Sequence, residues 1–330
     1  LLASFWSHLK LTDCANMNNP RNNPLPLNRK TREILYKRNQ TPFVLTPVTL
    51  LLITMIAFVT ASHTTLAAPV SSNAASVAEL TILSGGDRMP GLIYMAAGEG
   101  PHPTAVFLHG YPGNERSLDV AQAARAAGWN AVYFNYRGSW GAEGEFSFMN
   151  AEADVQSALK YLSNQDNATR LRVDPTQLSL VGHSMGGHMS VAGMLDSNNV
   201  RCAVAYDGVN IGTWAVSDKM WRDYSDTLFM LKGWSGAKSV AEVDAHGAKF
   251  DLVPRLKSLG ERHMLIVAAD TQVVPMQQHI TPIVEAVRKQ SPSQLEYHVI
   301  QDDHSFSANR KALTDLTISF LNRRCLAKQE

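Results

Sequence analysis

The feature that most constrains the fold is a regular alternation of apolar and amphipathic segments. The apolar segments lie at 79–84, 91–98, 104–110, 130–136, 178–184, 202–208, 263–270 and 295–301. The helix-like segments include 115–128, 150–165, 276–290 and a last one from about 307 to 326. Short apolar strands separated by amphipathic helices are typical of βαβ units, whose sheet is covered by helices on both faces. We therefore expect an α/β fold with a mostly parallel sheet.

The composition and charge of the chain exclude some classes of function. The chain has 330 residues, is 45% hydrophobic and carries a formal net charge of +1. These values suit one sizeable α/β domain. The sequence contains no stripe of arginine and lysine and no zinc-type spacing of cysteine and histidine, so we expect no nucleic-acid partner, metal or cofactor.

The first 68 residues differ from the rest. After Met17 the chain is rich in basic residues, then apolar from about Val44 to Val59, then small and polar. This order is typical of a secretory signal peptide, with cleavage near Ala67 or Ala68. We therefore divide the chain into a leader, 1–68, and a single folded domain, 69–330.

Two further interpretations concern the leader. Residues 1–16 precede the first methionine and read as upstream sequence translated by mistake, which leaves about 17–68 as the signal peptide. An uncleaved membrane anchor is the alternative to cleavage, because an apolar run of about 17 residues is near the lower limit for spanning a bilayer. Pro47 and several threonines in the run disfavour the anchor. We expect a secreted or periplasmic protein with no stable membrane insertion after cleavage.

A glycine-rich corner follows the apolar segment 178–181. Residues 182–186 read Gly-His-Ser-Met-Gly, the pattern G-x-S-x-G, at the point where a predicted strand passes into a helix. Glycines at these two positions let strand and helix approach closely and hold the serine in a strained turn. The pattern predicts that Ser184 is a nucleophile exposed at the edge of the sheet.

Four motifs together resemble the α/β-hydrolase superfamily. They read "HGYPGNERS", "FNYRGSWGAEGEFSF", "GHSMGG" and "QDDHSFS". Within the superfamily they are similar to the serine peptidases and esterases near the catalytic domains of prolyl oligopeptidase and acylaminoacyl peptidase, without a propeller. The resemblance covers about residues 79–325 and implies a catalytic serine, acid and histidine in that order along the chain.

The base that activates the serine is expected at His304. A serine hydroxyl becomes a good nucleophile only when a histidine removes its proton. His304 follows the last predicted strand, where the resemblance places the base. His188, in the helix after the corner, and His298, inside a strand, are interpreted as structural; His246, His263 and His279 are the other histidines after Ser184.

The acid is expected at Asp270, which ends the apolar segment 263–270. The loop after it, up to Val274 and Pro275, is one residue longer than in the proteins it resembles, so its path is expected to differ from theirs. Asp207, at the end of the preceding strand, is the alternative acid. Asp302 and Asp303 are expected to position the loop of the base or to face water.

Two backbone amides are expected to stabilise the oxyanion. One is the N–H of Met185 at the start of the helix, and the resemblance places the other at Tyr111, after the third strand. The alternative is a turn built by Gly110, Pro112 and Gly113 without a role in ligand binding.

A small helical cap is expected at about 210–255, between the sixth and seventh strands. This stretch is rich in aromatic residues. Trp214 and Trp221, together with Trp140 from an earlier loop, could form walls of a pocket for an acyl or aromatic group. The alternative is that these side chains only pack the cap on the body.

The resulting hypothesis is an exported serine hydrolase that cleaves a carboxylic ester of a small molecule through an acyl-enzyme. The first alternative is a serine peptidase acting on a short peptide, for which we find no recognisable site for an amino terminus. The second is a non-catalytic binding protein on the same fold, although such proteins usually lose the serine or the histidine, and Ser184 and His304 are both present.

The cysteines add one structural expectation. Cys14 lies in the leader, so the exported chain keeps Cys202 and Cys325 in a compartment that permits disulfides. Cys202 begins a strand, and Cys325 ends a helix that runs back to the same end of the sheet. A disulfide between them is expected; the alternative is a small core residue and a separate surface residue.

Overall fold

The computed structural model describes residues 73–214, 219–269, 271 and 273–327. The leader, its cleavage site and the acid expected at Asp270 therefore lie outside the described residues. Among the described residues, no helix is long and apolar enough to cross a membrane.

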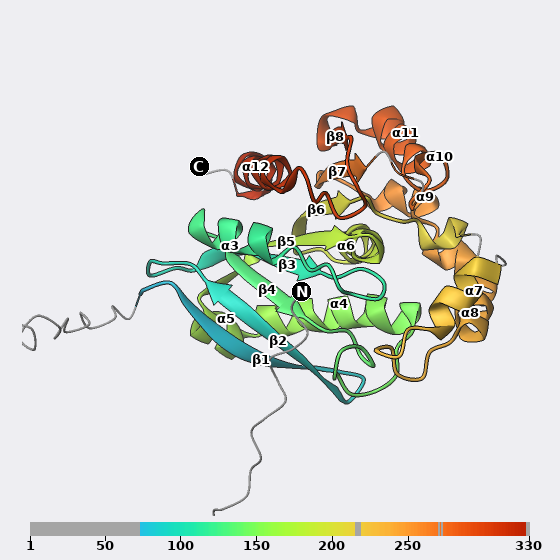
Figure 1. Ribbon diagram of the computed structural model, residues 1–330. Coiled ribbons are helices and arrows are strands. Elements are labelled where there is room, and N and C mark those ends of the chain that lie inside the picture. The colour runs from blue at the N-terminus through green and yellow to red at the C-terminus, as the bar shows by residue number, and fades with distance from the viewer. Residues whose placement is uncertain (1–72, 215–218, 270, 272, 328–330) are drawn as a thin grey trace, which may run out of the picture. The chain divides into compact units, whose positions relative to one another are not determined.

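A single eight-stranded sheet organises the described part of the chain (Figure 1). Its strands are β1 (Ser76–Ser84), β2 (Asp87–Met95), β3 (His102–Leu108), β4 (Asn130–Phe134), β5 (Val173–His183), β6 (Val200–Tyr206), β7 (His263–Ala269) and β8 (Leu295–Ile300). Their order across the sheet is β1-β2-β4-β3-β5-β6-β7-β8. β2 is antiparallel to β1 and β4, and all pairs from β4 to β8 are parallel. The expected α/β fold with a mostly parallel sheet is confirmed.

Helices cover both faces of this sheet. The α-helices of the described residues, those of the cap included, are α3 (Leu118–Ala126), α4 (Phe148–Ser163), α5 (Gln165–Leu171), α6 (Met185–Leu195), α7 (Lys219–Asp226), α8 (Gly236–Phe250), α9 (Leu252–Arg255), α10 (Met276–His279), α11 (Thr281–Gln290) and α12 (Arg310–Phe320). Along β3, Ala105 and Phe107 pack in the core under α3 and α12, whereas Val106 and Leu108 pack in the core under α4, α6 and α11. Because successive side chains of a strand point to opposite faces, continuous apolar strands fill both cores.

Local sequence signals explain where helices begin. Before α4, the Oγ of Ser147 accepts the N–H of Asn150 at 3.0 Å, which is an N-cap. Within the helix, Ala151, Val155 and Leu162 are buried at helical spacing. The side chains that the helix buries therefore follow from the periodicity of the sequence.

The expected cap lies between β6 and β7 and contains α7, α8 and α9. Figure 1 shows α7 and α8 together at one end of the sheet, apart from the helices on its faces. α8 lies within the stretch 210–255, where the helical cap was expected. Its start is marked by Ser235, whose Oγ accepts the N–H of Lys238 at 3.2 Å.

A disulfide joins Cys202 to Cys325, with a Cα–Cα distance of 5.6 Å. Cys202 lies near the start of β6, and Cys325 ends the turn of π-helix that follows α12. Between these ends, the hydroxyl of Tyr206 donates to Thr317 Oγ1 at 2.6 Å. The expected disulfide is confirmed, and α12 is bound to β6 at two levels.

Candidate active site

Ser184 occupies a strained corner between β5 and α6. Its backbone has φ 58° and ψ −119°, a conformation that non-glycine residues rarely adopt. A Cβ at Gly182 would overlap the carbonyl oxygen of Gly186, and a Cβ at Gly186 would overlap that of Leu108. The spacing of the glycines is therefore required for the strand and the helix to pack this closely. The serine hydroxyl is carried on the wall of a cavity.

The imidazole of His304 is held by Asp207. His304 Nδ1 lies 2.6 Å from Asp207 Oδ2, and the side chain of Asp207 is fully buried. The other carboxylate oxygen, Oδ1, accepts the N–H of Ala269 at 3.1 Å. Because a carboxylate only accepts, His304 donates from Nδ1 and keeps the lone pair on Nε2. This arrangement suits a general base.

The sequence had favoured Asp270 as this acid and kept Asp207 as the alternative. Asp270 lies outside the described residues, whereas Asp207 makes the hydrogen bond to His304. Asp207 follows β6 directly, in a left-handed backbone conformation with φ 41°. Its backbone N–H donates to Val267 on β7 at 2.7 Å, which fixes the corner that presents the carboxylate.

Neighbouring carboxylates shape the loop of the base. Asp302 Oδ2 accepts the N–H of Asn309 at 2.8 Å, and Asp303 Oδ1 accepts the N–H groups of Ser305 and Ser307 at 2.9 and 3.0 Å. These bonds close the turn between β8 and α12.

His183, beside the nucleophile, contacts the same loop. Its Nε2 lies 2.7 Å from the carbonyl oxygen of His304, and the two rings lie 4.5 Å apart. Burial and the nearby His304 lower the pKa of His183 to about 3, so its ring is neutral at pH 7. Nε2 therefore carries the proton and donates to that carbonyl. Sequence reasoning missed this residue, although it is the first variable position of the G-x-S-x-G pattern.

The loop after β3 passes directly against Ser184. A Cβ at Gly110 would lie 2.9 Å from the Cβ of Ser184, and Tyr111 lines the same cavity as the serine. Met185 is the first residue of α6, so its backbone N–H has no acceptor within the helix. The two amides expected to stabilise an oxyanion therefore belong to segments that meet at Ser184.

Trp140 was expected to form part of the pocket wall. In the structure it contacts the loop after β3 instead. Its indole N–H donates to the carbonyl of Pro112 at 2.8 Å. The guanidinium of Arg116 lies 5.1 Å from the Trp140 ring and donates through Nε to the carbonyl of Gly113 at 3.1 Å. These contacts support the turn that carries Tyr111.

A cavity of about 670 Å³ opens beside Ser184 and His304. Its wall is formed by Tyr111, Ser184, Val209, Trp214, Met220, Trp221, Tyr224, Val273, Val274, Pro275, Gln278, His279 and His304. The rings of Trp214 and Trp221 lie 3.9 Å apart, and Tyr111 stacks on Trp221 at 5.0 Å. Burial raises the pKa of Tyr111 to about 12, so the phenol is neutral. Much of the wall is therefore aromatic and uncharged.

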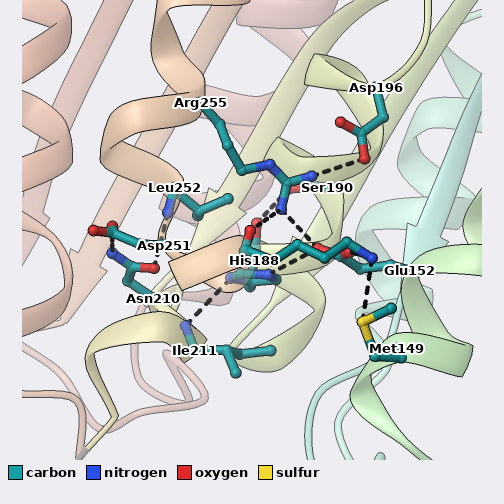
Figure 2. A network of polar contacts seen from close by, with 12 residues as sticks. Met149, Glu152, His188, Ser190, Asp196, Asn210, Ile211, Asp251, Leu252 and Arg255 are labelled. Carbon is teal, nitrogen blue, oxygen red and sulfur yellow. Dashed lines mark hydrogen bonds and ion pairs between the residues drawn. The ribbon is translucent and has the colours of Figure 1, made fainter. Parts of the chain in front are cut away.

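The two ends of the cap are joined to each other at one residue, Asn210. Its Nδ2 donates to Asp251 at 2.8 Å, and its Oδ1 accepts the N–H of Leu252 at 3.1 Å (Figure 2). The N–H of the next residue, Ile211, donates to Nδ1 of His188 in α6 at 3.3 Å. The helix after Ser184 therefore contacts the start of the cap directly.

The same network extends into the core through Glu152. Figure 2 shows its carboxylate between His188 and Arg255, at 3.4 and 2.8 Å. Burial disfavours the charged carboxylate, but hydrogen bonds and charges from its partners outweigh burial and lower the pKa of Glu152 to about 2. The pKa of His188 is also lowered, and there the cause is burial. His188, in α6, was interpreted from the sequence as a structural residue. In the structure its contacts are with Glu152 and with the start of the cap.

The described residues contain no group of three or more histidine, cysteine, aspartate or glutamate side chains that could hold a metal ion.

Comparisons with known proteins show which proteins this chain is similar to. The BD-FAE family model matches residues 93–219. No curated protein matches the chain. Among solved structures, the esterase Pf2001 from Pyrococcus furiosus has a TM-score of 0.57 and 15% identity, covering 76% of this chain and 92% of that one. Est1E from Butyrivibrio proteoclasticus has a TM-score of 0.58 and 14% identity, covering 74% and 97%.

A peptidase has the same fold. The acylaminoacyl peptidase from Pyrococcus horikoshii has a TM-score of 0.56 and 17% identity. The match covers 79% of this chain and 43% of the peptidase, so this chain spans less than half of that protein. The chain therefore has the α/β-hydrolase fold, and the BD-FAE family model matches its residues 93–219.

Proposed function

We propose that the protein is a serine hydrolase that cleaves carboxylic esters of small molecules through an acyl-enzyme. The observation that carries the proposal is the meeting of two features on one cavity wall. Ser184 sits in a strained corner, and His304 is held by a buried carboxylate with Nε2 left to accept a proton. This combination of nucleophile and oriented base is the arrangement that acyl transfer requires.

The residues then have distinct roles. Ser184 Oγ attacks the ester carbonyl while His304 Nε2 takes its proton, and Asp207 stabilises the resulting imidazolium. The N–H groups of Met185 and Tyr111 donate to the oxyanion of the tetrahedral intermediate. His304 returns the proton to the leaving alcohol, and the acyl group remains on Ser184. A water molecule, deprotonated by His304, releases the acid in the second half of the reaction.

Export is part of the proposal. The basic, apolar and small segments of the leader support it, and so does the Cys202–Cys325 disulfide, because such bonds persist in oxidising compartments. A secreted or periplasmic location is tested by fractionating cells and determining the amino terminus of the mature protein. Full-length protein retained in the membrane would instead favour the anchor.

The test of the mechanism is covalent labelling followed by turnover. A fluorophosphonate should label the wild type at Ser184 and should not label Ser184→Ala, whose ester turnover should fall on the order of 10⁵- to 10⁶-fold. Ser258→Ala is a matched control, because the substitution removes a hydroxyl that donates to the carbonyl of Arg255 at an exposed turn. Labelling that survives in Ser184→Ala would overturn the proposal.

A peptidase is the second candidate, and the likeness to the acylaminoacyl peptidase favours it over other activities. Panels of p-nitrophenyl esters and aminoacyl p-nitroanilides separate the two. We expect kcat/KM to be higher for the esters; the reverse order would assign the same site to peptide bonds. A non-catalytic binding protein would be inert toward both panels and toward the fluorophosphonate.

A further inference from the structure

His279 places a polar ring in the largely aromatic cavity wall. It is the last residue of α10, is 3% exposed, and lines the cavity together with Ser184 and His304. The rings of Trp214 and His279 lie nearly perpendicular to each other, with the centroids 6.4 Å apart at 80°. None of the roles described above involves this side chain.

The hydrogen bonds around Nδ1 determine which ring nitrogen carries the proton. The backbone N–H of Asn210, a fully buried residue, lies 3.3 Å from His279 Nδ1. The carbonyl oxygen of Asn210 also lies 3.3 Å from Nδ1, and the Thr213 hydroxyl lies 3.4 Å from it. That carbonyl, however, already accepts from Thr213 twice, from its hydroxyl at 3.0 Å and its N–H at 3.1 Å. Nδ1 is therefore needed as an acceptor for the Asn210 N–H and is not needed as a donor. A buried N–H left without an acceptor would be costly.

The neutral ring then has its proton on Nε2. Burial lowers the pKa of His279, despite the raising effects of the Asn210 carbonyl and Asp207, so the ring is neutral near pH 7. Among the described residues, none accepts a hydrogen bond from Nε2, and Nε2 is not among the side-chain atoms sealed in the core without a partner. The N–H is therefore left for whatever occupies the cavity.

We propose that Nε2–H of His279 donates to an oxygen of the bound substrate, so that the site selects esters with a hydroxyl, ether or carbonyl oxygen beyond the scissile carbonyl. The inference rests on the proposed function and names the substrate class of the same site. Most of the other wall residues are aromatic or aliphatic, among them Trp221, Val274 and Pro275. Gln278 is polar, but its amide donates to the carbonyl of Thr213. A hydrocarbon ligand would leave the Nε2–H group without an acceptor in an apolar environment. A single donor therefore favours a ligand that carries an oxygen over the isostere that lacks it.

The test uses pairs of esters in which one oxygen replaces one methylene. One pair is p-nitrophenyl methoxyacetate and p-nitrophenyl butyrate; longer pairs move the oxygen along the acyl chain, and a second series places it in the alcohol. For each pair, kcat/KM is measured for the wild type and for His279→Asn. Asparagine can place its amide oxygen near the position of Nδ1 and so keep an acceptor for Asn210, but it has no group at the position of Nε2.

We expect at least one oxygen-bearing ester to lose roughly 10- to 100-fold more than its methylene isostere on His279→Asn. His279→Gln, whose amide can reach the position of Nε2, should recover part of that difference. His298→Asn, on β8, is the matched control and should change both members of a pair equally. Equal losses within every pair on His279→Asn would overturn the proposal.

A measurement on the wild type keeps the proposal testable if the variants fail to fold. Long-range ¹H–¹⁵N spectra of the His279 ring should show the Nε2–H tautomer, and the Nδ1–H tautomer would overturn the proposal. Failure of the proposed function is distinguishable from either result, because it would appear as absence of labelling at Ser184 and of turnover for every ester.

Discussion

Replacing Asp207 with asparagine removes one acceptor from a site that uses two. The carboxylate accepts from His304 Nδ1 at 2.6 Å and from the N–H of Ala269 at 3.1 Å. Asparagine has one acceptor oxygen and one donor group, so it satisfies only one of these contacts. Because Asp207 is fully buried, no solvent replaces the lost acceptor.

The two orientations of the new amide predict the size of the effect. With its oxygen toward Ala269, the NH₂ group faces His304 Nδ1 and drives the proton to Nε2, where the base can no longer accept from Ser184. With its oxygen toward His304, the NH₂ group faces the Ala269 N–H, which costs about 1–3 kcal/mol as an unpaired buried donor. The first orientation should therefore dominate. We expect kcat to fall about 10⁴-fold, as in other triads whose acid becomes an amide.

The assay is hydrolysis of a p-nitrophenyl ester, with the rate of fluorophosphonate labelling as a second readout. KM should change little, because the substrate does not contact Asp207, and circular dichroism should confirm the native fold. Asp270→Asn is the matched comparison and should cost less than tenfold. The reasoning would be refuted by a larger loss in Asp270→Asn than in Asp207→Asn.

Three further predictions concern the framework. The double variant Cys202→Ala/Cys325→Ala should lose up to about 5 kcal/mol of unfolding free energy, from a sequence separation of 123 residues; less than about 1 kcal/mol in denaturant titrations would contradict the chain-entropy argument. The pKa of Glu152 is lowered to about 2 in the fold, so its stabilisation is complete above about pH 4.3 and is lost as pH falls through 2. Wild type should therefore lose Tm relative to Glu152→Gln over that range, and a constant difference would refute the assignment. Gly182→Ala should prevent native folding, because its Cβ would overlap backbone, whereas Gly247→Ala, with no neighbour closer than 3.6 Å, should fold normally; a folded, active Gly182→Ala would show that the corner can relax.

Sequence patterns predicted the fold because each of the relevant signals is local. Apolar period, glycine spacing and the position of Ser184 at the end of a strand depend on residues that are close together in the chain. The choice of acid could not be made in the same way. In the sequence, Asp207 comes directly after β6 and Asp270 directly after β7, and these two strands are parallel neighbours. The strand pattern therefore does not distinguish the two residues as partners of His304.

The polar residues that sequence reasoning passed over have distant partners. His183 contacts a carbonyl 121 residues away, and the ring of His279 is fixed by Asn210, 69 residues away. Neither spacing has a recognisable pattern, and a single buried histidine has no distinguishing local sequence. Trp140 is similar, because its indole meets the carbonyl of Pro112 across two loops.

The disulfide and the bond between acid and base lie at opposite ends of the same two elements. In β6, Cys202 lies near the start and Tyr206 is the last residue, directly before Asp207. The helix α12 runs from the loop of His304 toward Cys325. The strand and the helix are thus joined at three points. The disulfide joins them at one end, the His304–Asp207 contact joins the loops at the other end, and the Tyr206–Thr317 hydrogen bond is a further contact between them. If α12 moved away from the sheet, His304 would separate from Asp207. The Cys202–Cys325 disulfide limits that movement. Reduction of the disulfide should therefore make the base less well positioned before the protein as a whole unfolds.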